Sequence, residues 1–352
     1  MNISIKAGIL PVALLNTVAM TAANDSIVWK RQVYSTGHVR FRQEVLASPA
    51  MRNYLHTPSI SEFSVYVTTE PAAAARIPQV GRGGKQFGME ASSFQQLGAN
   101  SVVWGKASYQ NGKKYDVTWN ETSDFLLLYP YVMGDAKGGD QNYESYRLDG
   151  GYSTRHGKTC YGVDLGYRTL SEYRDRDPRP NNTVADLYAQ GGIGLNIWGS
   201  YSVALTATAG KYKQTNELAF YNELGTQMVY HLTGIGNDFT RFSGQGKNCF
   251  YKGYSIGAEI SMASKETTGW SASAGYLFTR KEKVLTDLNR LPLNRLEVNS
   301  LDGAVGYNNE DYGVRLTGNV AQRKGIDNLF GDATGNIYPQ IGSRKQYDGK
   351  IE

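Results

Sequence analysis

Residues 161–176 read YGVDLGYRTLSEYRDR, and alternate positions of this stretch hold two different kinds of side chain. One parity carries Tyr161, Val163, Leu165 and Tyr167, whereas the other carries Gly162, Asp164, Gly166, Arg168 and Glu172. A period of two residues places consecutive side chains on opposite faces of a β-strand. The stretch therefore predicts a strand with one aromatic and aliphatic face and one small or charged face.

The same alternation recurs along most of the chain after about residue 60. These runs are about 10–15 residues long, whereas strands of globular proteins average about 5–6 and tilted strands that cross a bilayer need about 9–11. Aromatic residues also gather near the ends of the runs, as in the girdles of membrane barrels. The sequence predicts strands near 61–69, 85–94, 100–109, 113–120, 125–133, 143–153, 159–173, 184–198, 201–212, 251–262, 269–281, 293–307 and 312–323, with one more near 344–351.

The predicted connections alternate between short and long. Short links are expected at 95–99, 121–124, 154–158, 198–200, 264–268 and 308–311. Between them lie the links 70–84, 134–142, 174–183, 213–250, 282–292 and 324–342, and the two-residue link Asn111-Gly112 falls on this second side. Bacterial outer-membrane barrels have short periplasmic turns and longer external loops. The sequence therefore predicts an all-β, antiparallel, up-and-down transmembrane β-barrel of about 12–14 strands rather than a soluble sandwich.

The first residues have the plan of a secretory signal peptide. Lys6 precedes a short apolar stretch and then the small residues Thr21-Ala22-Ala23, which together predict cleavage after a signal peptide spanning 1–23. Residues 24–60 are expected to form a periplasmic lead-in or small plug, and residues 61–352 the barrel. The chain stops at DGKIE, a charged run unlike the aromatic end of a finished barrel, so we expect it to be truncated.

Composition agrees with this class. The 352 residues include 40 Gly and 25 Tyr, which suit turns and pleated surfaces. The mean hydropathy of −0.45 is expected of strands whose residues alternate. The formal net charge of +5 is too mild to indicate a nucleic-acid partner.

Charged and polar side chains on the non-aliphatic parity are predicted to face a lumen. An Arg or Lys on the lipid face costs about 2–4 kcal/mol at the bilayer midplane. Mixed signs inside the barrel would either form ion-pair ladders that close a narrow barrel or line a polar path. The lumen-facing candidates are Asp164, Arg168, Glu172, Asp186, Gln190, Glu259 and Arg315.

Two long external links carry the remaining candidate binding residues. RDRDPRP at 174–180 would hold calcium or an anionic glycolipid headgroup at the rim, or would be a self-neutralising loop, which its nearly cancelling charges favour. The link 213–250 is rich in aromatic residues, so we expect an ordered, hairpin-forming element that plugs the lumen, caps it or contacts a partner. The external candidates are Arg174, Asp175, Asp177, Tyr221, His231 and Phe239.

No motif predicts catalysis, a metal or a cofactor. The four histidines, His38, His56, His156 and His231, have no metal-ligand spacing. A hydrolase site at the outer rim around His231 is the weakest hypothesis, and the favoured interpretation of His231 is a surface imidazole. The GGIG at 191–194 lies inside a predicted strand, where it cannot cradle a phosphate. Cys160 and Cys249 are expected at opposite ends of strands and therefore unpaired.

Several stretches resemble a known family. They are VVWGKASYQNGKK (102–114), LLYPYVMGDAKGGD (127–140), YRTLSEYRDRDPRP (167–180), AGKYKQTNELAFYNELG (209–225), VYHLTGIG (229–236) and LFGDATGNIYPQI (329–341). Together they resemble an uncharacterised family of outer-membrane β-barrel proteins from Bacteroidota-type bacteria. The resemblance implies a barrel in the outer membrane of a Gram-negative bacterium, and it brings no catalytic residues.

Two functions follow from this fold. The first is the transport or uptake of a small solute across the outer membrane. The second is a non-conducting structural or surface-binding barrel that works through its external loops. The expected partners are outer-membrane lipid and lipopolysaccharide, with a neighbouring outer-membrane receptor or lipoprotein as a further candidate.

Overall fold

A computed structural model describes residues 48–54, 59–71, 74–222, 228–234, 236–244, 248–266, 268–286, 290–309, 312–330 and 337–351, without the side chains of Trp198, Arg241 and 329–351. The predicted signal peptide, His38 and His56 lie outside the described residues. Most of the described chain forms one antiparallel sheet of 12 strands, each hydrogen-bonded to the next strand of the sheet along the chain. This confirms the predicted all-β, up-and-down fold, with a strand number at the lower end of the predicted range.

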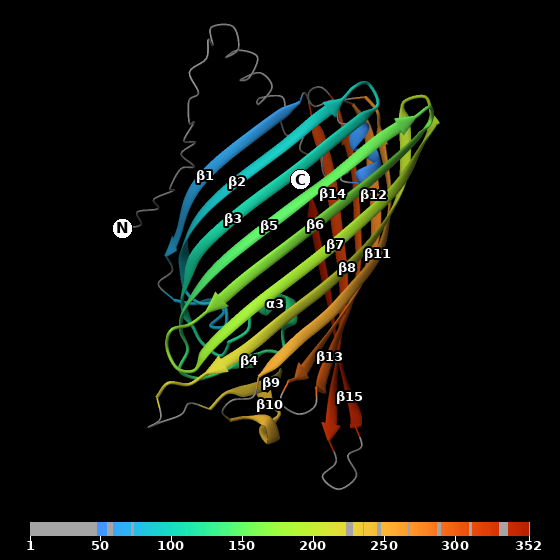
Figure 1. The fold of residues 1–352 in the computed structure, drawn as a ribbon. Coiled ribbons are helices and arrows are strands. Elements are labelled where there is room, and N and C mark those ends of the chain that lie inside the picture. The colour runs from blue at the N-terminus through green and yellow to red at the C-terminus, as the bar shows by residue number, and fades with distance from the viewer. Residues whose placement is uncertain are drawn as a thin grey trace, which may run out of the picture.

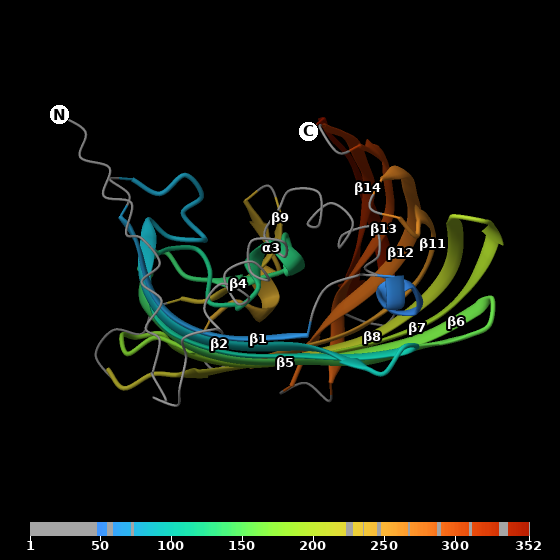
Figure 2. The same ribbon diagram turned by 90° about the horizontal axis from the view of Figure 1, so that it is seen from above.

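The strands are 12 to 20 residues long. Their bounds are β1 (Ile60–Pro71), β2 (Gly83–Leu97), β3 (Ser101–Val117), β5 (Gly139–His156), β6 (Thr159–Tyr173), β7 (Arg179–Trp198), β8 (Tyr201–Ala219), β11 (Cys249–Ser264), β12 (Gly269–Leu285), β13 (Leu291–Asn308), β14 (Gly313–Phe330) and β15 (Ile337–Ile351). The sheet curves strongly around a concave face (Figures 1 and 2). Within the described residues it is open between β1 and β15, which are its two edges.

The connections separate the two ends of the sheet. At the short-turn end, β5–β6 and β7–β8 are joined by two residues each; at the loop end, the links after β3 and β8 are long. The loop end holds the smaller elements: α3 (Phe125–Leu128), the short strands β4 (Met133–Gly134), β9 (Tyr230–Gly234) and β10 (Asn237–Asp238), and the 3-10 helix η2 (Thr240–Phe242). A further 3-10 helix, η1 (Pro49–Tyr54), lies on the concave face near the short-turn end.

The two faces of β6 match the pattern of the opening stretch. The side chains of Tyr161, Val163, Leu165 and Tyr167 point outward and are 47%, 53%, 58% and 43% exposed, whereas Asp164 on the concave face is 5% exposed. The same parity holds on the neighbouring strands, because paired residues share a face. The convex face is therefore apolar and the concave face polar.

The apolar side chains of the convex face form a belt, which we define by the outward residues of 201–209 on β8, 254–262 on β11 and 270–278 on β12, each nine residues long, and their counterparts on the other strands. Aromatic pairs border it. Trp270 lies 5.2 Å from Tyr307 at the short-turn side, and Tyr254 lies 6.1 Å from Phe278 at the loop side, centroid to centroid. Nine residues is the length with which a tilted strand crosses a bilayer, about 9–11.

Two of the predicted strands are wrong. The expected link Asn111-Gly112 lies in the middle of β3, and the expected strand 113–120 is largely the end of that strand. A Cβ on Gly112 would come within 2.6 Å of the Tyr143 hydroxyl and 2.7 Å of the Lys85 carbonyl oxygen. Gly112 therefore allows close packing within the sheet rather than a hairpin turn.

The other wrong strand is 125–133. Its residues begin with four apolar side chains in a row, and such a run does not distinguish strand from helix. Phe125–Leu128 are helical and lie on the concave side (Figure 2). Each error removes one predicted strand before β5. Removing two strands leaves the direction of every later strand unchanged, so the strands after residue 139 keep their predicted directions.

None of the helices among the described residues is long and apolar enough to cross a membrane. Cys160 and Cys249 are both buried, and no disulfide joins them.

Candidate functional site

The interior of the curved sheet is occupied at the loop end by the link between β3 and β5. We call residues 118–138 the plug. It contains α3 and β4, and in Figure 2 it lies within the concave side of the sheet. Its backbone is folded on itself: the Trp119 amide donates to the Asp135 carbonyl at 2.9 Å, and the Glu121 amide donates to the Met133 carbonyl at 2.7 Å. The plug is thus an ordered body inside the sheet rather than part of the wall.

Arg174 links the plug to the wall. It follows the last residue of β6, and its side chain is 1% exposed. Its Nη2 donates to Glu121 Oε1 at 2.8 Å and to Asp135 Oδ2 at 2.7 Å. Nη2 and Nε also donate to the Pro178 carbonyl, at 2.7 and 3.0 Å. One buried guanidinium therefore joins both ends of the plug to the β6–β7 link.

The two carboxyl groups around Arg174 have opposite pKa shifts. Burial, followed by the nearby Asp135 carboxylate, raises the pKa of Glu121 well above its ordinary value. Burial also acts to raise the pKa of Asp135, but Arg174, Glu121 and the Gly138 amide outweigh it and lower that pKa. Of the two carboxyl groups, Glu121 therefore takes up a proton more readily, and Asp135 more readily stays ionised beside the charge of Arg174.

A second charged contact holds the helical part of the plug. Arg168 on β6 donates from Nη1 to Asp124 Oδ1 at 3.0 Å and from Nη2 to Asp124 Oδ2 at 2.5 Å. The Tyr212 hydroxyl on β8 donates to the same carboxylate at 3.0 Å. This fork-to-fork geometry is the strong form of an Arg–carboxylate contact.

Cations from the later strands bind carbonyl groups of the plug. Lys283 on β12 donates to the Val132 carbonyl at 2.8 Å, and Arg323 on β14 donates to the Tyr129 carbonyl at 2.6 Å. Plug contacts therefore reach strands from β6 to β14, far apart around the curved sheet.

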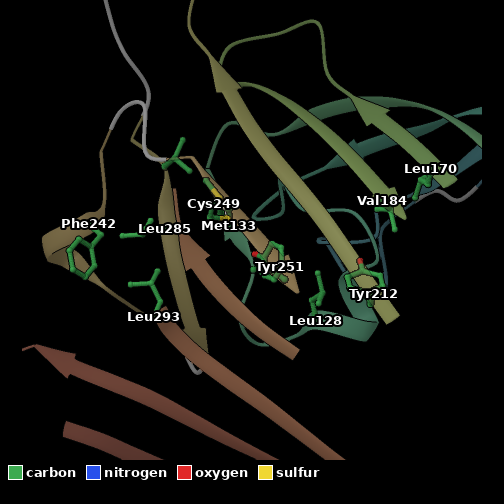
Figure 3. Packing of buried hydrophobic residues seen from close by; sticks show 12 residues of the cluster. Leu128, Met133, Leu170, Val184, Tyr212, Phe242, Cys249, Tyr251, Leu285 and Leu293 are labelled. Atoms are coloured by element: carbon green, nitrogen blue, oxygen red, sulfur yellow. Dashed lines mark hydrogen bonds between the residues drawn. The ribbon is translucent and has the colours of Figure 1, made fainter. Parts of the chain in front are cut away.

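The link between β8 and β11 covers the plug, and we call its described residues 228–234 and 236–244 the cover. In the cover, β9 pairs with β10 and with β4 of the plug, which confirms an ordered, hairpin-forming element in this link. Figure 3 shows apolar side chains of plug, cover and wall packed in one cluster. Its labelled members are Leu128, Met133, Leu170, Val184, Tyr212, Phe242, Cys249, Tyr251, Leu285 and Leu293.

Residues 48–54, which we call the lead segment, lie on the concave face at the other end of the sheet. Ser48 and Thr206 share a hydrogen bond of 2.6 Å between their hydroxyls, and the Tyr54 hydroxyl donates to Asn196 Oδ1 at 2.6 Å. A Cβ on Gly162 would lie 2.2 Å from the Pro49 carbonyl. Glycine at this position lets the backbone of the lead segment touch the wall.

The seven residues predicted to face a lumen all lie on the concave face. Asp164 accepts from the Trp104 indole N–H at 2.7 Å, and Glu172 pairs with Lys114 at 2.6 Å. Gln190 donates to Thr208 at 3.2 Å, and Arg168 lies 3.7 Å from its cross-strand partner Asp186. Glu259 and Arg315 line a cavity of about 330 Å³ together with Asp302. The structure thus divides them between plug anchoring, cross-strand pairing and this cavity.

The predicted external residues have more varied positions. Arg174 is buried in the plug contact, and Asp175 accepts from Asn142 at 3.2 Å. Asp177 accepts from the amides of Tyr221 and Asn222, while Arg179 lies 4.2 Å above the Tyr221 ring.

His231 and Phe239 lie within the cover. Phe239 is partly buried against the cluster of Figure 3. His231 is 0% exposed and sits opposite Met133, so the interpretation of it as a surface imidazole is wrong. The side chain of His231 is buried because its strand, β9, pairs with β4 of the plug.

Sequence reasoning missed the plug side of these contacts. The sequence predicts Glu121 and Asp124 in a short turn and Asp135 in an external link, and it indicates no role for any of them. Their signal in the sequence was three carboxylates within a short stretch beside apolar residues. Among the described residues, no group of three or more His, Cys, Asp or Glu side chains is arranged to hold a metal ion.

The sequence matches a family of unknown function, DUF6850, over residues 49–351. The chain belongs to this family. The matched span begins at the lead segment and ends in β15, so the family's defining region includes the sheet, the plug and the cover.

No curated protein matches the sequence. Among solved structures, the toluene transporter TodX of Pseudomonas putida is similar at a TM-score of 0.35 and 10% identity, covering 88% of this chain and 92% of that chain. At that TM-score the similarity carries no argument about function.

Proposed function

We propose that this protein is an outer-membrane β-barrel of a Gram-negative, Bacteroidota-type bacterium that takes up a small solute through an interior gated by the plug. The convex belt supports the membrane part of the proposal: nine-residue apolar runs bordered by aromatic residues on both sides match the thickness that a barrel must cover. A soluble protein would expose this surface to water at a large cost.

A bilayer location also requires that the sheet be closed. Lipid offers no hydrogen bonds to an open strand edge, so a spanning sheet leaves none. The proposal therefore includes the pairing of the β1 and β15 edges, directly or through further strands.

The observation that carries the transport function is the plug itself. A chain segment inside a polar interior, joined to the wall by side-chain contacts rather than by sheet hydrogen bonds, is able to move without breaking the sheet. Buried charged contacts contribute little net stability compared with apolar packing, yet they fix one arrangement. This combination suits a gate more than a permanent core.

A second function is favoured by the cover. Its strand β9 pairs with β4 of the plug and buries His231 between them, as a non-conducting barrel that binds a partner through its outer loops would do. We propose no enzymatic activity and no cofactor in either case: full burial of His231 argues against a rim site open to substrate. Lipid, lipopolysaccharide and a neighbouring receptor or lipoprotein are the proposed partners.

Conductance separates the two functions. The purified protein is reconstituted in planar bilayers beside a variant in which residues 121–134 are replaced by a short Gly/Ser linker. We expect small, intermittent currents from the unmodified protein and large, stable currents from the variant. Circular dichroism and heat-dependent migration on gels check that the sheet of the variant is folded. A folded variant that inserts but stays silent would overturn transport and leave the surface-binding function.

A further inference from the structure

One large cavity of this protein lies outside the interior. It has a volume of about 960 Å³ and is lined by the ends of β8, β11 and β12 toward the loop end. Most of its side chains belong to the outward parity of these strands, including Lys211, Lys213, Lys252 and Arg280. It is therefore a groove in the convex face, which the interior mechanism does not use.

The position of the groove relative to the belt is sharply defined. Outward residues of β8 are apolar from 201 to 209, and the next two are Lys211 and Lys213. On β11 the outward residue beyond Tyr254 is Lys252, and on β12 the residue after Phe278 on that face is Arg280. Strand register puts Lys213 beside Lys252, and Lys211 beside Tyr254. On each of the three strands, cations therefore take the outward positions directly beyond the end of the apolar surface.

Glu282 organises part of this group. Its carboxylate lies 2.5 Å from Arg280 and 3.3 Å from Lys252, so it holds two of these cations. Lys211 and Lys213 are exposed, and no ion pair engages either of them within the described part of the chain. The groove is lined by five cations, Lys211, Lys213, Lys252, Arg280 and Arg290, against the two carboxylates Glu217 and Glu282, and by Tyr254. This excess of positive charge has the chemistry of a phosphate site beside an apolar surface.

We infer that this groove binds the phosphorylated headgroup of an anionic lipid in the surrounding leaflet, with the acyl chains lying along the belt. The inference rests on the proposed membrane location and adds a defined lipid site to it. Lys211 and Lys213 contact the phosphate groups, whereas Lys252 and Arg280, held by Glu282, set the shape of the groove. A free phosphate would gain the charges but not the adjoining apolar surface, so a lipid is the favoured source.

The test compares two double variants with equal loss of charge. K211Q/K213Q removes the uncommitted lysines, and K85Q/K324Q removes two lysines of the convex face on β2 and β14, outside the groove. Each protein in neutral detergent is titrated with diphosphorylated lipid A, and lipid-bound species are counted by native mass spectrometry. At about a five- to sixfold effect per lysine near a membrane surface, we expect about 30-fold weaker binding for K211Q/K213Q and no more than a twofold change for the control.

Equal binding by the two double variants would overturn the site. Inorganic phosphate that binds as tightly as the lipid would overturn the assignment to a lipid. Insertion into phosphatidylcholine bilayers is measured in parallel, because it distinguishes the two proposals: a protein that inserts but shows no groove-dependent binding refutes this inference alone, whereas a folded protein that never inserts refutes the membrane location.

Discussion

Replacing Arg174 by Met should release the plug from the wall. The methionine fills most of the same volume, but it leaves the Asp135 carboxylate buried without its cation. Asp135 is 1% exposed and Arg174 is 2% exposed, so solvent does not screen the loss. Removing one partner of a buried ion pair typically costs about 3–5 kcal/mol. Because Arg174 helps to lower the pKa of Asp135 whereas burial raises that of Glu121, the unpaired Asp135 should account for most of that cost.

The effect is local, so the measurement must also be local. Hydrogen exchange at the amides of Trp119 and Glu121 reports the opening of the plug, because both donate to carbonyls within it. A loss of about 3–5 kcal/mol in opening free energy raises their exchange rates roughly 150- to 4,000-fold, up to the limit set by complete opening. Amides of the central strands should change little.

Arg176→Gln is the matched control, since Arg176 lies two residues away and is exposed; its effect should stay within about 0.5 kcal/mol. Adding Asp135→Asn to Arg174→Met should restore part of the protection, because it removes the uncompensated charge. If Arg174→Met exchanges at the same rate as Arg176→Gln, the buried guanidinium does not hold the plug and the gating argument loses its basis.

Two further predictions concern the same interior. The pKa of Glu121 is raised above the ordinary 4.5, so the folded plug binds a proton more tightly than the opened plug does. Protection of the plug amides should therefore be greatest below about pH 4.5 and fall as pH rises toward the raised pKa. Hydrogen exchange measured across pH should show a flatter profile for Glu121→Gln, and an unchanged slope would rule out a protonated Glu121. Gly162→Val should push the lead segment off the wall, at a cost of about 1–3 kcal/mol, so that a cysteine introduced at Met51 reacts with a thiol reagent. In the control Gly191→Val the added atoms meet open space, and the introduced cysteine should stay protected. Equal labelling of the two variants would show that the lead segment does not depend on the contact at Gly162.

The wall was predictable from sequence because its rule is local. The alternation of β6 gave its bounds, Thr159–Tyr173, and also which side chains face outward. The seven concave-face residues followed from the same parity, since a strand has only two faces. Register with neighbours then needs only consecutive pairing, which antiparallel meanders supply.

The plug was not predictable because its rule is not local. Arg174 meets Glu121 and Asp135 across separations of 53 and 39 residues, and nothing in a single sequence selects these partners. The stretch around Phe125 also imitates a strand, with apolar residues and a tyrosine near its end. The predicted directions of the later strands are still correct only because two predicted strands are absent, one merged into β3 and one replaced by the plug.

The contacts of the two interior segments imply unequal roles in any solute path. The plug binds side chains from β6 through β14 and so reaches across the curved interior. The lead segment packs mainly against β5, β6, β7 and β8, which form one side of that interior. A segment that lies along one side narrows a path, whereas a segment fixed on distant strands obstructs it. Loss of the plug should therefore change conductance far more than displacement of the lead segment, and Gly162→Val should enlarge the current of the plug-replaced variant while having little effect on the unmodified protein.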